Sequence, residues 1–219
     1  MLTIAPDLVP VNYKGKPNDL EFFITLPSWA EAHELFNQAM KRLLKPDIWH
    51  NLAGWASAHF TLIGADGNPI RRSPETGDYL RIDIPGPGPM QGHGYDWVTI
   101  QNIDDYFDVS GEQEWVAMKV HPSPAPGKTG VAAHFFESEA SSTFIIQRSG
   151  NKVTSRYHGR NEVPNTSTGQ PVDNIRNAMV AAGAMLSFSE VQWSALCKAF
   201  IAWEDTGEKS AEGLDQPDK

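Results

Sequence analysis

The sequence predicts an α+β fold, in which a curved antiparallel β-sheet of about seven to eight strands is packed by an N-terminal helix and by C-terminal helices. Three observations support this prediction. A strand-like run and an amphipathic helix come first, short alternating runs joined by turn residues follow, and helical spacing returns only at the end. Parallel strands would need long crossovers, and no helical pattern interrupts the middle region, so we expect antiparallel pairing.

Length and composition favour one domain. A chain of 219 residues with 40% hydrophobic residues can bury one core of ordinary size. We expect an extended, Pro- and Gly-rich N-terminal arm over residues 1–19, a single α+β domain over residues 20–203 and an acidic flexible tail over residues 204–219. The tail holds six acidic residues and two lysines, so it carries −4 of the formal net charge of −9. With almost no apolar residue, it cannot offset its ordering entropy by burial.

The first two elements are a strand and a helix. Residues 20–26 alternate apolar side chains in the manner of a strand with one buried face. Ser28 and Glu31 then have the spacing of a capping box, in which a hydroxyl and a carboxylate satisfy free N–H groups at a helix start. Apolar residues recur at helical spacing from Trp29 to Leu43, which predicts an amphipathic helix with one buried stripe.

The middle of the chain predicts a run of short strands. Asp66-Gly67 and Gly150-Asn151 are dipeptides typical of tight hairpin turns. The strands are expected over residues 57–63, 79–84, 96–103, 114–121, 131–137, 143–148 and 152–158.

Two helices are expected at the C-terminal end. Residues 172–188 and 189–203 both place apolar side chains at helical spacing. Ser187 and Glu190 again have capping-box spacing, so we expect the helix to break there.

This order of elements resembles the helix-grip arrangement, in which a strongly bent antiparallel sheet wraps a C-terminal helix. The resemblance covers residues 20–203 and rests on the order of elements. It implies a cavity between the sheet and the helix. Because one fold hosts many functions, it does not imply a particular activity.

Charge and cysteine content exclude several functions. The net charge of −9 argues against nucleic-acid partners and anionic membranes, which both require clustered lysine and arginine. The single cysteine, Cys197, excludes an internal disulfide and a cysteine-based zinc site. The seven histidines show no metal-ligand spacing, so we predict no metal and no cofactor. No stretch has the length of a signal peptide core or a membrane span, which favours a cytoplasmic protein.

A long loop over residues 85–95 contains alternating proline and glycine. Proline supplies no N–H group, and a strand rather than a helix is expected after Gly94, so the loop does not fit a phosphate-binding motif. It either connects two strands or overhangs the mouth of the cavity as a lid. In the second case His93, Tyr95 and Trp97 would lie near its rim.

Further candidate ligand-binding residues come from the predicted strands. If their polar faces line a concave sheet, they can supply convergent groups for a ligand; otherwise they form an ordinary wetted face. Two arginines in the polar segment 156–165 can clamp an anion, or simply mark a solvated strand end. These candidates are His59, Arg81, Asp83, His121, His134, Arg156 and Arg160.

Three functions remain open. The first is the binding of a small apolar or aromatic molecule in the cavity, favoured by the element order and by seven tryptophans. The second is an enzyme that uses the same cavity, with His59, Asp83 or His134 as acid–base groups. The third is a protein-interaction module with a filled core, whose acidic surface or tail meets a basic partner. Exposed edge strands would also allow a homodimer.

Overall fold

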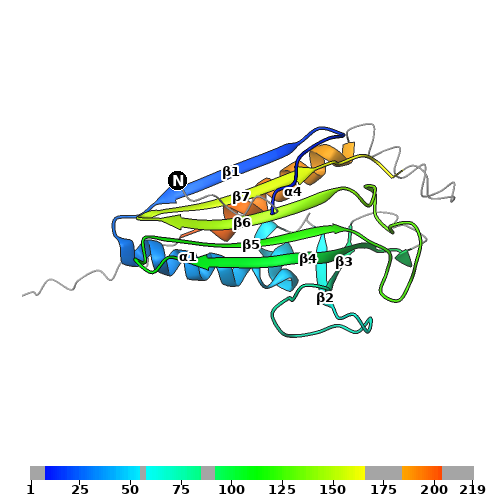
Figure 1. The fold of residues 1–219 in the computed structure, drawn as a ribbon, viewed down its shortest axis with the longest axis horizontal. Helices are drawn as coiled ribbons and strands as arrows, with labels where there is room; N and C mark the ends of the chain where they lie inside the picture. Colours follow the sequence, from blue (N-terminus) through cyan, green and yellow to red (C-terminus); the bar gives the residue numbers. More distant parts are fainter. Residues whose placement is uncertain (1–7, 55–57, 85–91, 166–183, 204–219) are drawn as a thin grey trace, which may run out of the picture.

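A seven-stranded antiparallel sheet forms the centre of the molecule, in the strand order β1-β7-β6-β5-β4-β3-β2 (Figure 1). The computed structural model describes residues 8–54, 58–84, 92–165 and 184–203. The strands are β1 (Asn18–Thr25), β2 (His59–Ile63), β3 (Tyr79–Asp83), β4 (Asp96–Phe107), β5 (Gln113–Pro122), β6 (Ser141–Ser149) and β7 (Lys152–Arg160). The helices are α1 (Trp29–Leu43), the 3-10 turn η1 (Pro46–Ile48), α2 (Trp49–Ala53) and α4 (Ala184–Phe200).

The helices pack against one face of this sheet. Leu35 and Phe36 of α1 and Phe200 of α4 share one buried cluster with sheet residues such as Val116 and Phe144. The N-terminal strand β1 pairs with β7, and α4 runs alongside these two strands (Figure 1). The predicted α+β class and its helix-grip arrangement are therefore confirmed.

Strand alternation decides which residues face the helices. In β3, Leu80 and Ile82 are buried in the main core, while Arg81 between them points to the opposite face. The main core is thus built from the apolar side of each strand.

Helix α1 begins as the sequence predicts. The hydroxyl of Ser28 accepts a hydrogen bond from the backbone N–H of Glu31 at 3.2 Å, which satisfies one free donor of the first turn. Ala32, Leu35 and Phe36 then lie on the buried side of the helix. Trp29 lies outside the buried stripe and is 41% exposed.

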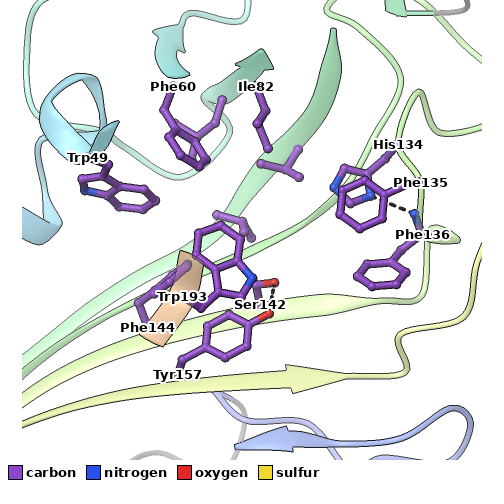
Figure 2. Close-up of a pocket in the computed structure, with 13 residues that line it drawn as sticks. Trp49, Phe60, Ile82, His134, Phe135, Phe136, Ser142, Phe144, Tyr157 and Trp193 are labelled. Carbon is purple, nitrogen blue, oxygen red and sulfur yellow. Dashed lines mark hydrogen bonds between the residues drawn. The ribbon is translucent and has the colours of Figure 1, made fainter. Parts of the chain in front are cut away.

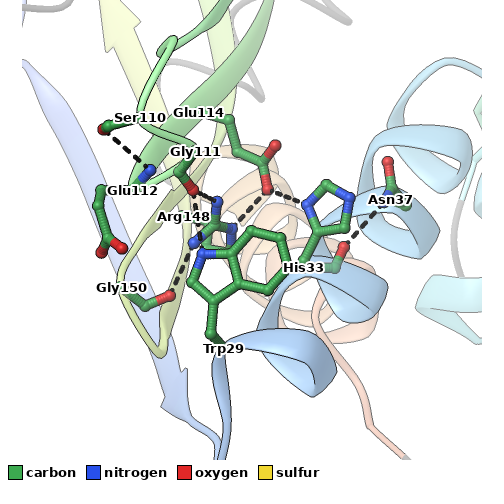
Figure 3. A network of polar contacts seen from close by, with 9 residues as sticks. All are labelled: Trp29, His33, Asn37, Ser110, Gly111, Glu112, Glu114, Arg148 and Gly150. Carbon is green, nitrogen blue, oxygen red and sulfur yellow. Dashed lines mark hydrogen bonds and ion pairs between the residues drawn. The ribbon is translucent and has the colours of Figure 1, made fainter.

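A buried ion pair joins the start of α1 to the sheet (Figure 3). The Arg148 guanidinium is fully buried and donates to the Glu114 carboxylate and to the carbonyl oxygens of two turns, at Gly111 and Gly150. His33 Nδ1 lies 2.8 Å from the same carboxylate. The Trp29 ring covers the guanidinium at 4.9 Å and donates its own N–H to Gly111. We call Trp29, His33, Glu114 and Arg148 the clasp.

Two sequence predictions are wrong. Residues 131–137 form a loop instead of a strand. Ala133 exchanges backbone hydrogen bonds with Trp97 of β4 and with Ser123, and an isolated bridge joins Phe136 to Pro164, so no continuous ladder forms. Helix α4 runs from Ala184 to Phe200 without a break at Ser187. Capping-box spacing does not require a helix start, because serine is also tolerated inside a helix when tertiary packing favours it. Residues 172–183 and 85–91 lie outside the described part of the chain.

The described part of the N-terminal arm packs on the sheet face opposite the helices. Leu8 is buried against Trp115, Ala117 and Ile145, and its carbonyl accepts a hydrogen bond from Thr143 at 2.7 Å. This contact covers part of the outer face of β5 and β6.

The two edges of the sheet differ. The edge of β2 is partly covered by the chain's own loop, since the N–H of Ile70 donates to the carbonyl of Leu62 and Ile63 bridges to Pro69. Strand β1 forms the other edge. Pairing of an exposed edge in a homodimer stays a prediction.

Candidate functional site

A small pocket lies between the helix-facing side of the sheet and α4 (Figure 2). Trp193 of α4, Trp49 of α2 and Phe60 of β2 form part of its wall, and a loop bearing His134, Phe135 and Phe136 closes the far side. The remaining lining residues come from the sheet and are Leu80, Ile82, Val98, Val120, Ser142, Phe144 and Tyr157. The cavity has a volume of about 30 Å³.

Aromatic rings hold the wall nearest α4 together. The Trp193 ring stacks on Tyr157, with centroids 5.5 Å apart and planes at 20°. Phe144 meets Trp193 edge-on at 5.2 Å and also lies 5.3 Å from Trp49. Such contacts contribute beyond their buried area, so this wall is expected to be well ordered.

The loop on the opposite wall is fixed by two buried polar side chains. The carboxylate of Asp96 accepts a hydrogen bond from the N–H of Phe135 at 3.1 Å. The Asn165 side chain donates to the carbonyls of Ala132 and His134, at 3.1 and 3.2 Å. These bonds satisfy backbone groups that would otherwise be buried without partners, and they hold the three aromatic rings of the loop at the pocket.

Two polar residues of the lining, Ser142 and Tyr157, form a hydrogen-bonded group with Glu162, which lies outside the lining; we call these three residues the polar corner. The Tyr157 hydroxyl lies 3.0 Å from the Ser142 hydroxyl and donates to the Glu162 carboxylate at 2.9 Å. Tyr157 is fully buried and Glu162 is half-buried. The corner is therefore a short hydrogen-bonded chain that runs from the apolar pocket toward a carboxylate.

Burial changes the acidity of both ends of this chain. Burial raises the pKa of Glu162 to about 7, although the Tyr157 hydrogen bond and the positive charge of Arg160 act in the opposite direction. The pKa of Tyr157 is well above its usual value, mainly because of burial and then because of the nearby Glu162 charge. A carboxyl group that titrates near neutral pH can both hold and release a proton there.

Glycine and asparagine residues give Glu162 its position. A side chain at Gly159 would collide with the Glu162 carboxylate, since an added Cβ would lie 2.3 Å from Oε1. Gly15, with a φ of +63°, lets the N-terminal arm lie against the Glu162 backbone. Asn161 also has a positive φ, of 54°, and its side chain accepts from the N–H of Tyr13 at 2.9 Å. The arm and the end of β7 thus support the carboxylate together.

Of the sequence-predicted candidates, only His134 lines this pocket. Its Nδ1 accepts a hydrogen bond from the N–H of Phe136 at 3.0 Å, and its ring stacks on Phe135. One ring nitrogen is therefore committed to shaping the loop.

Arg81, Tyr95 and Trp97 come together on the opposite face of the sheet. The Arg81 guanidinium lies 4.6 Å from the centre of the Tyr95 ring, and Trp97 is buried there with Ala133. The Trp97 indole donates to the carbonyl of Gly92 at 3.1 Å, which fixes the end of the long loop. Strand alternation explains this placement, because Arg81 and Trp97 are cross-strand partners on the outer face.

Four other candidates are dispersed. His59 stacks on His50 at 4.2 Å, whereas Asp83 and His93 are exposed. His121 is partly buried at the end of β5, where burial lowers its pKa. None of these four residues belongs to the pocket lining.

The two predicted anion-binding arginines form ion pairs within the chain. Arg156 pairs with Glu21 at 2.6 Å, and Arg160 pairs with Asp19 at 2.7 Å. Both carboxylates lie on β1, so these contacts connect β1 to β7 across the sheet surface.

Sequence reasoning missed the polar corner and Trp193. Ser142 and Tyr157 are separated by 15 residues and occupy neighbouring strands, where polar residues are common. Trp193 lies in the helix expected over residues 189–203, and its helical spacing predicts burial but no ligand contact. The arginines of segment 156–165 predict an anion site. Glu162, in the same segment, belongs to no motif that would predict a functional role, and only its position after a strand distinguishes it.

Comparisons with known proteins show similarity only among solved structures. No protein-family model matches this sequence, and no curated protein matches it. Norcoclaurine synthase from Thalictrum flavum is 13% identical over 92% of this chain and 91% of its own, with a TM-score of 0.38. Ginseng major latex-like protein 151 from Panax ginseng is 16% identical over 80% and 98%, with a TM-score of 0.33. Ara h 8.0201 is 12% identical over 83% and 99%, with a TM-score of 0.34.

The fold is a helix grip. The chain's own strand order and the position of α4 establish this, while TM-scores below 0.5 add no argument about the site. Within the described residues, no group of three or more potential metal ligands gathers in one place. None of the described helices is long and apolar enough to cross a bilayer.

Proposed function

We propose that this chain binds a small apolar or aromatic molecule in the pocket between sheet and α4, with a polar group of the ligand directed at the polar corner. The observation that carries this proposal is the contrast within one pocket, where a largely aromatic and aliphatic wall, which also includes His134, meets the hydrogen-bonded Ser142–Tyr157 pair. Ligand sites are typically apolar surfaces with a few polar groups that fix orientation.

The size of the cavity limits the ligand. A volume of about 30 Å³ is far below the roughly 300–1,000 Å³ of sites for drug-sized molecules. Occupation by anything larger than a few atoms therefore requires a lining side chain to move. Trp193 is the best candidate, because it comes from α4 and is only half-buried, whereas the sheet residues Phe144 and Tyr157 are fully buried.

A matched pair of ligands tests the proposal. Toluene and p-cresol have nearly the same shape, but only p-cresol can hydrogen-bond to the corner. Titration of each into the protein, followed by the indole N–H signals in NMR, is expected to shift Trp49 and Trp193 and to leave Trp29 and Trp115 unchanged, because these two lie outside the pocket.

The hydroxyl of p-cresol should strengthen binding about threefold to tenfold, as expected for one net hydrogen bond. Ser142→Ala should reduce that advantage without filling the pocket. If neither ligand shifts Trp49 or Trp193 at millimolar concentration, the pocket is not a binding site for this class of molecule.

A second candidate is an enzyme that uses the same pocket for general acid–base catalysis. It is favoured by a specific observation, the carboxyl group of Glu162 with a pKa of about 7 in contact with a tyrosine of the pocket lining. In this proposal Glu162 and Tyr157 take the acid–base roles that the sequence analysis predicts for His59, Asp83 or His134. Incubation with small aryl ketones in D₂O tests it, because proton abstraction next to a carbonyl would introduce deuterium; Glu162→Gln should abolish that exchange.

A third candidate, an interaction module with a filled core, is favoured by the small cavity volume. It predicts that the toluene and p-cresol titrations leave all indole signals unchanged. The ligand titration therefore separates it from the first proposal.

A further inference from the structure

A large open groove lies away from the pocket, between the C-terminal end of α1 and the loop that connects β2 to β3. Its volume is about 1030 Å³. Met40, Lys41 and residues 44–47 of the α1–η1 segment form one side, and residues 69–73 of the loop form the other. Figure 1 shows this loop extending below the sheet, next to β2.

The rim of this groove is positively charged. It contains Lys41, Lys45, Arg71 and Arg72 but only one carboxylate, Asp47. Arg72 is already held by Asp78, at 2.7 Å. Lys41, Lys45 and Arg71 are exposed, and no ion pair between them and another described residue is present. A local excess of positive charge on a chain of net charge −9 indicates a site for an anionic partner.

The floor of the groove is apolar. Met40, Leu44 and Ile70 are partly buried there, and Leu62 of β2 is buried. A partner suited to this groove therefore combines carboxylates with at least one apolar side chain.

The described part of the chain ends close to this groove. Arg42 of α1 donates hydrogen bonds to the carbonyls of Phe200 and Ala202, both at 2.8 Å, so the exit of α4 is fixed against α1. Lys41 is the chain neighbour of Arg42, and Lys45 lies three residues further on, just past the end of α1, a length of chain that spans at most about 11 Å. The 16 residues from Glu204 to Lys219 can extend to about 50 Å, and so they reach any point of the groove.

The composition of this segment matches the groove. Residues 204–219 carry six acidic side chains and two lysines. Leu214 is their only large apolar residue, and it stands between Glu212 and Asp215. Carboxylates on both sides of a leucine fit a groove with a cationic rim and an apolar floor.

We propose that residues 204–219 dock intramolecularly into the groove, with Leu214 on its floor and the flanking carboxylates at Lys41, Lys45 and Arg71. Attachment to α4 supplies an effective concentration in the millimolar range, so weak individual contacts suffice for occupation. Surface ion pairs are screened by salt, so the docked state should be lost at high ionic strength. This inference does not depend on the function proposed for the pocket.

Paramagnetic relaxation enhancement in the full-length protein tests the docking. A nitroxide label is attached through Ser210→Cys, and Cys197 does not compete because it is fully buried. At low ionic strength we expect the amide signals of the groove residues that carry an N–H, which are residues 40, 41, 44, 45, 47 and 70–73, to broaden strongly. The signals should recover severalfold at about 1 M salt, where the Debye length is only about 3 Å.

Charge reversal provides the matched comparison. Lys41→Glu, Lys45→Glu and Arg71→Glu in one protein should abolish the enhancement. Lys16→Glu with Lys128→Glu, at exposed positions outside the groove lining, should leave it intact. Leu214→Ser should weaken the relaxation enhancement at the groove, even though this substitution changes no charge.

Two outcomes would overturn the proposal. One is that the signals of the groove residues do not broaden, or that they still broaden after charge reversal of the rim. The other uses a mixture of two samples: spin-labelled protein without ¹⁵N, and ¹⁵N-labelled protein without a spin label. Broadening of the groove signals in this mixture would show that the segment docks on a second copy of the chain.

Discussion

The clasp and the polar corner both hold a carboxylate beside aromatic rings, buried in the clasp and half-buried in the corner, but of the two only the clasp binds its carboxylate with an arginine. In the clasp, Glu114 receives the Arg148 guanidinium, whose remaining bonds go to backbone carbonyls. In the corner, the hydrogen-bond donor that the described residues supply to Glu162 is the neutral hydroxyl of Tyr157, and Arg160 acts on this carboxyl group through its charge without such a bond. The two sites therefore stabilise a carboxyl group that is shielded from water in different ways: one by an ion pair, the other by a neutral hydroxyl.

The difference separates a structural site from a reactive one. A buried carboxylate with a buried cation stays charged, fixes geometry and is costly to disturb. A buried carboxyl group without one shifts its pKa toward neutrality, and it can then exchange a proton with a ligand. The cavity lies beside the corner, where Tyr157 and Ser142 belong to its lining. The clasp joins α1 to two turns of the sheet instead (Figure 3).

The largest effect is expected from breaking the clasp. Arg148→Met leaves Glu114 buried without its cation, so the free energy of unfolding should fall by about 3–5 kcal/mol. Urea denaturation followed by circular dichroism measures this. In the double variant Glu114→Leu with Arg148→Met, both charges are absent and most of the loss should be recovered. A double variant as unstable as the single one would show that the ion pair is not the source of the effect.

The second prediction concerns Trp193 in the pocket wall. Trp193→Ala should lower the free energy of unfolding by about 2–3 kcal/mol, less than a fully buried tryptophan, because the side chain is half-buried. At the same time it should enlarge the cavity and strengthen the binding of indole, measured by calorimetry. Trp115→Ala on the opposite face is the control, since it also removes a buried ring. Equal indole binding by the two variants would contradict the proposed site.

The third prediction tests the carboxyl group of the corner through pH. The folded-state pKa of Glu162 is about 7, above that of an exposed glutamate, so the folded protein holds this proton more tightly than the unfolded chain does. Protonated Glu162 therefore contributes to the free energy of unfolding. This contribution is fully present below the pKa of Glu162 in the unfolded chain, and it is lost as the pH rises through about 7. Between pH 5 and pH 8 the loss should reach about 1–3 kcal/mol, and Glu162→Gln should remove it.

Glu139→Gln is the matched control for this pH effect. Glu139 is exposed and pairs with Lys14, and its pKa is lowered by hydrogen bonds and by the lysine charge. Its replacement should leave the slope between pH 5 and pH 8 unchanged. A slope that is the same in the native protein and in Glu162→Gln would mean that this carboxyl group does not titrate in that range.

Local patterns were sufficient to predict most of the fold. The Ser28 cap and the apolar stripe located α1, and alternation located seven strands, because both signals depend on residues close in sequence. The apolar run at residues 131–137 was misassigned for the same reason. Its side chains line the pocket and a neighbouring cluster, and only the distant Asp96 and Asn165 show that its backbone does not join the sheet.

The site was less predictable, because it depends on which face of each strand is buried. Polar side chains on strands predict candidates such as Arg81, yet the helix-facing side of the sheet carries the apolar alternates Leu80 and Ile82. His134 lies at the pocket because of a loop contact rather than a strand position. The raised pKa of Glu162 follows from its burial, and its position depends on the space that Gly159 leaves for its carboxylate. Neither the burial nor this contact can be predicted from a single sequence without the fold.

The smallest effect is expected from removing the helix cap at Ser28. It tests whether the clasp and this cap stabilise the start of α1 independently. Ser28→Ala removes the hydrogen bond to the N–H of Glu31, which should lower the free energy of unfolding by about 1 kcal/mol. Ser28→Asp retains an acceptor and should lose less. Because Ser28 precedes Trp29 directly, a double-mutant cycle with Trp29→Ala measures their coupling. If the clasp alone fixes this end of the helix, Ser28→Ala should cost more in the Trp29→Ala background than in the native protein; equal costs would show that the cap works without the clasp.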